Sequence, residues 1–241
     1  YKRQLAGDAL TTGSSNVAFG LHALGAEDTC SRNVAIGISA LAALNYDGSG
    51  YNIAIGYDAG KSVSTGDRNT LIGGLAADSL TTGQYNIAIG YQALGSEDVG
   101  NRAVGIGYQA LYSQNNSTST DTYNVALGFQ AGYSVTTGVD NVLIGGLAGD
   151  AITTGNYNIA IGKSALSTED GHGRNIAIGW QALKDLNAGA DAYNIAIGHD
   201  AGKFVSTGVS NVIIGGLAGD ALTSGSHTIA LGLNAVSYTH L

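Results

Sequence analysis

Proline and methionine are absent from the 241 residues, cysteine and tryptophan occur once each, and only 12% of residues are charged. The lone Cys30 excludes an intrachain disulfide, so packing has to supply the stability. No apolar run approaches the ~18 residues that a membrane-spanning helix needs. Because a native reading frame begins with methionine, its absence leads us to expect a fragment whose N-terminus has been trimmed.

Basic residues are also scarce, since 10 lysines and arginines face 18 acidic residues, giving a formal net charge of −8. An acidic chain repels phosphate backbones and anionic lipid head groups, so neither nucleic acid nor a membrane surface is expected as a partner. Hydrophobic residues make up 44% of the chain, which excludes a disordered polymer.

Glycine is abundant, with 38 residues, and it ends a short phrase that reads Asn-x-Ala-Ile-Gly in many copies. We call the last glycine of each phrase the marker glycine. The thirteen marker glycines are Gly20, Gly37, Gly56, Gly73, Gly90, Gly107, Gly128, Gly145, Gly162, Gly179, Gly198, Gly215 and Gly232. The step between them is about 17 residues, and it is longer before Gly56, Gly128 and Gly198, once in every four steps. The chain therefore has thirteen repeat units arranged in a four-unit cycle.

A unit of about 17 residues is too short for a two-helix repeat. Each phrase carries β-branched residues at alternating positions between Asn and Gly, which predicts a strand, and a second short run such as 91–94 predicts another. Two strands and two turns per unit make an all-β, parallel β-roll or β-solenoid of about thirteen coils, each of roughly 17–21 residues. With coils ~4.8 Å apart, we expect a rod on the order of 60 Å long.

We expect residues 1–236 to form a single repeat domain. Residues 237–241 depart from the pattern and indicate a truncation or a sequence scar. Asn opens eleven of the thirteen phrases, and stacked Asn side chains predict a ladder along the coils. The marker glycine never varies, which predicts a bend or a close approach that leaves no room for Cβ.

Residues two apart in a strand share a face. The bulky residues that flank the central Ala, such as Ile53 and Ile55, are expected to fill the inside of the coil. The central residue then points outward, where a monomer would carry polar residues, yet it is always apolar. The third residue after each marker glycine is always Ala, which predicts close approach of the facing strand or of another copy.

The outward apolar stripe predicts an oligomer, because a monomer rarely exposes so much apolar surface. The residues expected at this interface are Ala18, Ala35, Ala54, Leu71, Ala88, Ala126, Leu143, Ala160, Ala177, Ala196 and Ile213. Where the central residue is Leu or Ile, the residue after the marker glycine is Gly, at Gly74, Gly146 and Gly216. This exchange of volume predicts that the two positions share one packed space.

The pattern N-[VI]-A-[IL]-G-x-x-A resembles the head repeats of trimeric autotransporter adhesins, and N-x-A-I-G-Y-Q-A-L at 86–94 resembles repeats in phage tail-fibre proteins. The resemblance covers residues 5 to about 236. It implies a left-handed parallel β-roll with three chains, intertwined or side by side, used as an attachment fibre. The unit of about 17 residues, rather than about 14, and the four-unit cycle favour the phage-fibre interpretation.

Acidic pairs followed by arginine recur in three units, as Glu27-Asp28 with Arg32, Glu97-Asp98 with Arg102, and Glu169-Asp170 with Arg174. They predict a salt bridge in a loop, worth ~0–1 kcal/mol if exposed, with a cation bound where chains meet as the alternative. Asp8, Asp78, Asp150 and Asp220 recur in one turn, where Asp stabilises the turn itself.

The five histidines occupy mostly unrelated positions, and no Ser-His-acid or Cys-His set clusters by spacing. The sequence therefore predicts no catalytic residue, no metal site and no cofactor, and a chain that is not an enzyme.

The three longer steps hold polar loops at 45–50, 112–122 and 184–192, and such loops project outward. They are either solvated coverings or contacts for a receptor or glycan. The candidate recognition residues are Tyr46, Asp47, Asn115, Asn116, Asp121, Asp185, Asn187 and Asp191.

Together these observations predict a structural shaft segment of a homotrimeric phage tail fibre, extracellular on the virion and used in host-cell adhesion. The alternatives are the head of a bacterial trimeric autotransporter adhesin on the cell surface and a monomeric binding solenoid.

Overall fold

The computed structural model describes residues 5–26 and 29–236, and these residues contain strands and turns but no helix. Thirteen three-residue strands follow one another, one before each marker glycine. They are β1 Val17–Phe19, β2 Val34–Ile36, β3 Ile53–Ile55, β4 Thr70–Ile72, β5 Ile87–Ile89, β6 Val104–Ile106, β7 Val125–Leu127, β8 Val142–Ile144, β9 Ile159–Ile161, β10 Ile176–Ile178, β11 Ile195–Ile197, β12 Val212–Ile214 and β13 Ile229–Leu231. The chain is a parallel β-solenoid of thirteen coils. The tail predicted at 237–241 lies outside the described residues.

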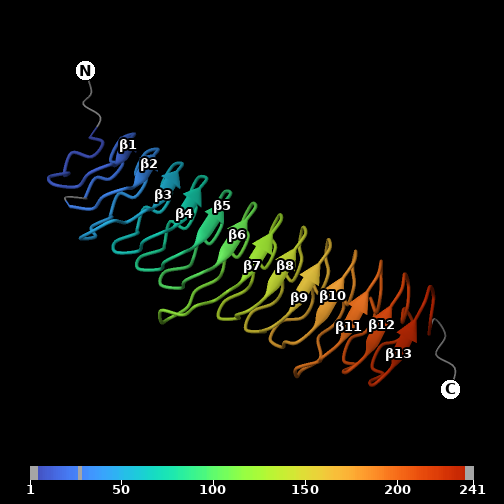
Figure 1. The fold of residues 1–241 in the computed structure, drawn as a ribbon. Helices are drawn as coiled ribbons and strands as arrows, with labels where there is room; N and C mark the ends of the chain where they lie inside the picture. Colours follow the sequence, from blue (N-terminus) through green and yellow to red (C-terminus); the bar gives the residue numbers. More distant parts are fainter. Residues whose placement is uncertain (1–4, 27–28, 237–241) are drawn as a thin grey trace. The chain divides into compact units, whose positions relative to one another are not determined.

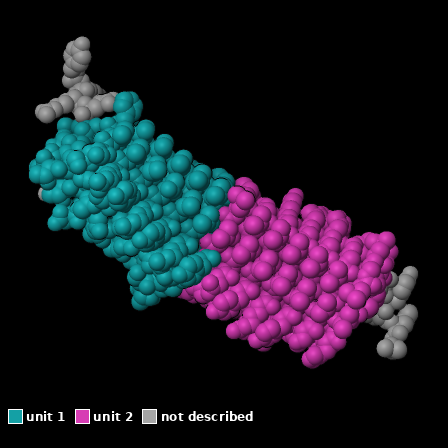
Figure 2. All heavy atoms as spheres, in the orientation of Figure 1, with its two compact units in different colours: residues 1–123 teal, residues 124–241 magenta. Residues whose placement is uncertain are grey.

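Two compact units divide the chain, residues 1–123 with β1 to β6 and residues 124–241 with β7 to β13 (Figure 2). Within each unit every strand pairs in parallel with the next and without a shift in register (Figure 1). Ile53 lies opposite Thr70, for example, and Thr70 opposite Ile87. The prediction of one phrase per coil is confirmed.

The second strand predicted in each coil is wrong. Residues 91–94 form a turn, in which Gln92 and Leu94 have φ of 53° and 52°. Left-handed backbone at every second residue prevents an extended chain. The turn still bonds to its neighbours, because the Leu94 N–H donates to the Ala110 carbonyl of the next coil at 3.0 Å. Each coil therefore has one strand wall and one wall made of turns.

The two faces of each strand are the reverse of the prediction. The central residues lie inside the coil, and the bulky residues beside them, such as Ile53 and Ile55, lie outside. Of the eleven residues predicted at an outward interface, Ala18 in the first coil is half-buried. The fully buried ones are Ala35, Ala54, Leu71, Ala88, Ala126, Leu143, Ala160, Ala177, Ala196 and Ile213. They are core residues of the single chain, so they cannot form that interface.

The space around the central position of the strand is narrow. A Cβ built on the central Gly105 would lie 3.1 Å from the carbonyl oxygen of Ala110 and 3.3 Å from Leu94 Cγ. Ala110 is the third residue after Gly107, so the invariant Ala stripe is the turn wall of the same coil facing its own strand. If the two bulky strand residues of a coil pointed into this space they would overfill it, whereas the one small central residue fits.

The exchange of volume is real, but it involves a different position. A Cβ on Gly60, four residues after its marker glycine, would lie 2.5 Å from Leu71 Cδ1, and one on Gly202 would lie 2.9 Å from Ile213 Cδ1. Most coils with a small central residue carry Leu at this fourth position, as at Leu94. A Cβ on Gly74 would meet only the ring of Tyr91, at 3.6 Å, so the predicted partner position is wrong.

The predicted Asn ladder is confirmed. Asn69 is fully buried, and its backbone N–H donates to Asn52 Oδ1 at 3.0 Å while its Nδ2 donates to the Gly83 carbonyl at 2.9 Å. Asn86 repeats both bonds one coil further along. The side chain thus satisfies backbone groups at the corner of the coil that the three-residue strand does not reach.

Marker glycines are required because their Cβ position is occupied. Gly73 has φ of 132°, and a Cβ there would lie 2.5 Å from the Gly90 carbonyl oxygen, whereas a Cβ on the adjacent Gly74 would have room.

We expect Gly73→Ala to lower the free energy of unfolding by about 2–5 kcal/mol, because the alanine would be strained at this φ and its Cβ would overlap with backbone. Gly74→Ala, the matched control, should change it by less than about 0.5 kcal/mol. Denaturant unfolding followed by circular dichroism measures both, and equal losses would contradict this role for the marker glycine.

Candidate functional site

An apolar face follows the outside of the strands. In the third coil Tyr51, Ile53 and Ile55 alternate with the buried Asn52 and Ala54, and Tyr57 follows the marker glycine. Tyr51 is 49% exposed, Ile53 38% and Tyr57 57%. These positions lie five, three and one residues before the marker glycine and one residue after it. We call the four columns that they form along the coils the outward face.

The two middle columns of the outward face are apolar in every coil except at Thr70. Their most exposed members are Val17, Phe19, Ile53, Leu127, Ile197, Ile214, Ile229 and Leu231. No charged side chain interrupts either column, so within each unit the surface is continuous. The sequence signal that could have identified this face is the smallness of Ala on both walls, which indicates a narrow interior.

One border of the outward face, five residues before the marker glycine, alternates Arg and Tyr from Arg32 to Tyr123 and from Tyr157 to Tyr193, with Asp140 between the two runs. Arg68 lies between two rings, with its guanidinium carbon 6.0 Å from the Tyr51 centroid and 5.3 Å from that of Tyr85. The contacts run through Arg32, Tyr51, Arg68, Tyr85, Arg102 and Tyr123 in the first unit and through Tyr157, Arg174 and Tyr193 in the second. Each exposed contact contributes about 0.5–1 kcal/mol and holds successive coils together.

The other border, one residue after the marker glycine, is also rich in rings. Tyr91 and Tyr108 stack with centroids 5.7 Å apart, and Trp180 and His199 with centroids 4.6 Å apart. Gly74, Gly146 and Gly216 interrupt this column in every fourth coil.

The predicted loop residues do not share one environment. Asp47, Asn115 and Asn187 are exposed, and Tyr46 and Asp185 are half-buried. Asp121 and Asp191 are exposed as well, but each pairs with an arginine of the preceding coil, Asp121 with Arg102 and Asp191 with Arg174. The loops are therefore fastened to the solenoid at their C-terminal ends.

Asn116 is wrong as a recognition residue, because it is 4% exposed and bonds inward. Its Nδ2 donates to Glu97 Oε2 at 3.2 Å, and Gln114 Nε2 donates to the same oxygen at 2.9 Å. Glu97 is fully buried, and its Oε1 accepts the backbone N–H groups of residues 98–100 at 2.7–3.2 Å. Both oxygens of the buried Glu97 carboxylate therefore have hydrogen-bond donors from the protein.

The predicted pairing of these glutamates with the following arginines is therefore wrong. Glu97 and Glu169 occupy an interior position of the coil, seven residues after the marker glycine, where other coils carry Leu44 or Val63. Arg102 and Arg174 pair with loop aspartates instead. The corresponding pair at 27–28 lies outside the described residues.

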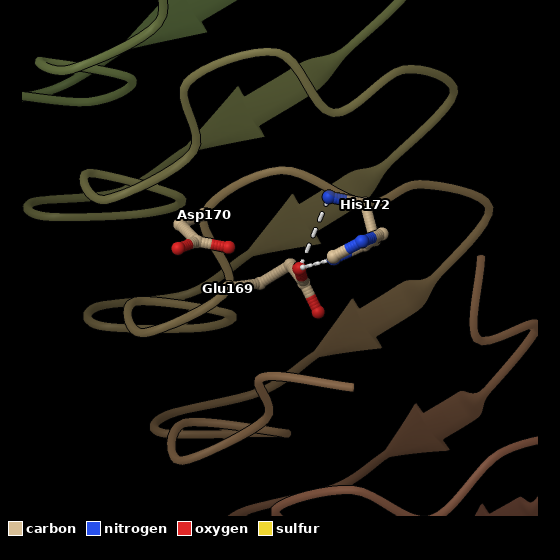
Figure 3. Close-up of side chains that lie close together, drawn as sticks. All are labelled: Glu169, Asp170 and His172. Atoms are coloured by element: carbon tan, nitrogen blue, oxygen red, sulfur yellow. Dashed lines mark hydrogen bonds and ion pairs between the residues drawn. The ribbon is translucent and has the colours of Figure 1, made fainter. Parts of the chain in front are cut away.

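Glu169 belongs to a group with Asp170 and His172 (Figure 3). Glu169 Oε1 accepts the His172 backbone N–H at 3.1 Å and lies 3.2 Å from His172 Nδ1. One ligand atom from each of the three side chains lies within 4.8 Å of the others. Within the residues that the structure describes, no other group of three such side chains comes this close.

The four recurrent aspartates lie in turns, as predicted. Burial raises the pKa of the Asp150 carboxyl above its ordinary value, and Asp150 Oδ1 accepts no hydrogen bond. Burial also raises the pKa of Asp78, to which the nearby Asp58 charge adds, against the lowering effects of its own backbone N–H and of Lys61.

Comparison of the chain with protein-family models, with curated proteins and with solved structures finds no match. None of the described residues form a helix long and apolar enough to cross a membrane.

Removing the Glu97 carboxylate should release the loop at 112–122 from its hydrogen bonds to the neighbouring turn. We expect Glu97→Ala to lower the free energy of unfolding by at least about 3 kcal/mol, because each buried donor left unpaired costs ~1–3 kcal/mol. Amide hydrogen exchange at residues 98–100 and 116 should accelerate. Asn115→Ala, at an exposed position of the same loop, is the control, and unchanged exchange in Glu97→Ala would refute the anchoring role.

The raised pKa of Asp150 predicts a pH dependence of stability. The folded state holds this proton more tightly than the unfolded chain, whose pKa is near 3.8, so ionisation destabilises the fold as pH rises through the raised pKa. Asp150→Asn should therefore raise the Tm at pH 7, and the gain should vanish below pH 3.8. Thermal melts across this range check the effect, Asp47→Asn at an exposed site is the control, and a gain independent of pH would rule out this origin.

Proposed function

We propose that the chain is a structural shaft segment of a homotrimeric attachment fibre of the phage tail-fibre type, and that it serves host-cell adhesion. The observation that carries the proposal is the outward face, whose two middle columns are apolar in all coils but one. The occupant we assign to this face is another copy of the same chain.

The size of the outward face supports this assignment. Four columns of residues spaced two apart are about 20 Å wide, and six or seven coils are about 24–29 Å tall. Each unit thus presents on the order of 500 Å², near the upper end for a soluble monomer. The faces of the two units together amount to about 1,000 Å², which exceeds the roughly 800 Å² per partner of a standard protein interface.

The regularity of the face favours a copy of itself over an unrelated partner. Parallel copies place columns of the same coil spacing side by side, so every coil meets an equivalent coil. The absence of charge from the middle columns leaves no buried charge to compensate in such an interface. The number three rests on the resemblance to trimeric adhesin heads and phage fibres.

In this proposal the function of the coils is mechanical. The Asn ladder, the Arg–Tyr column and the strand pairing each link neighbouring coils, which makes every unit a stiff spacer. The exposed loop residues Asp47, Asn115 and Asn187 are the outward positions from which a receptor or glycan would be contacted. The head of a bacterial trimeric autotransporter adhesin is the alternative, and the length of the coil together with the four-coil cycle favours the fibre.

Mass in solution tests the assembly. Light scattering after size exclusion should give three times the chain mass of 24.2 kDa. Ile89→Glu combined with Ile178→Glu places a charge on each unit's outward face and should yield monomers, because burying unpaired charges is costly.

Thr154→Glu, an exposed turn residue away from the face, is the matched control and should leave the trimer intact. A wild-type chain that is a monomer of 24.2 kDa in solution would contradict the proposal. A trimer that survives both Ile substitutions would mean that the interface lies elsewhere. The complete reading frame of the protein separates the fibre from the adhesin, because the two classes of protein differ in the domains that accompany the repeats.

A further inference from the structure

Two turns of the solenoid are equivalent in position but not in chemistry. Glu97 follows Gly90 by seven residues and Glu169 follows Gly162 by seven, and both carboxylates are fully buried inside their coils. A buried carboxylate needs either hydrogen-bond donors or a positive charge. The two turns therefore provide an internal comparison.

The Glu97 turn supplies donors. Three backbone N–H groups bond to Oε1, and the side chains of Gln114 and Asn116 in the next coil bond to Oε2. The position equivalent to His172 is Gly100, which contributes only its backbone N–H.

In the Glu169 turn the side-chain donors of the next coil are gone. Leu186 stands at the position of Gln114 and Ala188 at that of Asn116. Within the described part of the chain, Glu169 Oε2 accepts a long hydrogen bond from the Ala188 N–H at 3.4 Å in their place. The turn has gained an imidazole instead, with His172 Nδ1 at 3.2 Å from Glu169 Oε1.

We propose that Glu169, Asp170 and His172 form a binding site for a divalent transition-metal ion such as Zn²⁺. Two carboxylates and one imidazole are ligands that Zn²⁺ accepts, with water completing the coordination. The ion would stabilise the Glu169 carboxylate at Oε2, where the two amide donors of the equivalent turn are replaced by a 3.4 Å contact, while His172 already lies beside Oε1. Asp170 is exposed and the His172 side chain is 30% exposed, so the site is accessible to solvent.

The site lies within one unit of one chain, so the proposal does not depend on assembly into a fibre. Its local consequence is to fasten the turn at 169–172, where the equivalent turn is fastened by Gln114 and Asn116.

Calorimetric titration tests the site. The untagged chain, stripped of metal with a chelator, is titrated with ZnCl₂, and we expect one equivalent to bind and the Tm to rise. The same titration with Co²⁺ should give visible absorption bands typical of a coordinated ion. His172→Gly, which installs the residue of the equivalent turn, should abolish the one-site binding, and Asp170→Asn should weaken it.

His22→Asn, a histidine substitution in the other unit, is the control and should bind as the wild type does. Leu186→Gln with Ala188→Asn keeps all three ligands but restores the amide donors, so this variant should bind the ion more weakly. Circular dichroism without metal establishes that each variant is folded. Absence of one-site binding by the wild type, or equal binding by His172→Gly, would overturn the proposal. Equal binding by the amide-restored variant would overturn the compensation argument.

Discussion

The narrowness of each coil is the constraint on which the rest of the structure depends. The strand wall and the turn wall approach so closely that the central residue has room only for a small side chain where the turn wall carries Leu, and a larger central residue such as Leu71 is accommodated where Gly60 removes a side chain. The valine and isoleucine residues of the strands are consequently displaced to the outside. A chain with an ordinary hydrophobic content thus acquires an apolar surface along its strands.

A narrow interior also changes the role of polar residues. The strands are only three residues long, so many backbone groups at the corners of the coil have no partner within a strand pair. The buried Asn ladder supplies those partners, coil after coil. Glu97 does the same at one turn, where it collects donors from its own coil and from the longer loop of the next. That loop therefore contributes buried residues, Gln114 and Asn116, to the core, while others such as Asn115 are exposed to solvent.

The proposed assembly and the proposed metal site follow from two different consequences of this geometry. The outward face is apolar because the valines and isoleucines of the strands lie outside the coil, and in the proposed assembly copies of the chain provide the apolar surroundings that water does not. The Glu169 turn retains a buried carboxylate without the side-chain amides that stabilise its equivalent, and a bound ion would stabilise the carboxylate in their place. Arg102 and Arg174 serve neither carboxylate, because they stack on tyrosines and pair with loop aspartates outside the coil.

Spacing and residue type alone predicted the class of fold, the number of coils, the Asn ladder and the need for marker glycines, because each depends on a repeat length or on backbone chemistry that a single residue type reveals. They did not determine which strand face is buried. Alternation separates the two faces, but both are apolar here, so polarity could not distinguish inside from outside. Only the tertiary structure placed Ala54 inside and Ile53 outside, because the decision depends on the distance between two walls. The burial of Glu97 and Asn116 was likewise not predictable, because it depends on how the loop of one coil packs against the turn of its neighbour.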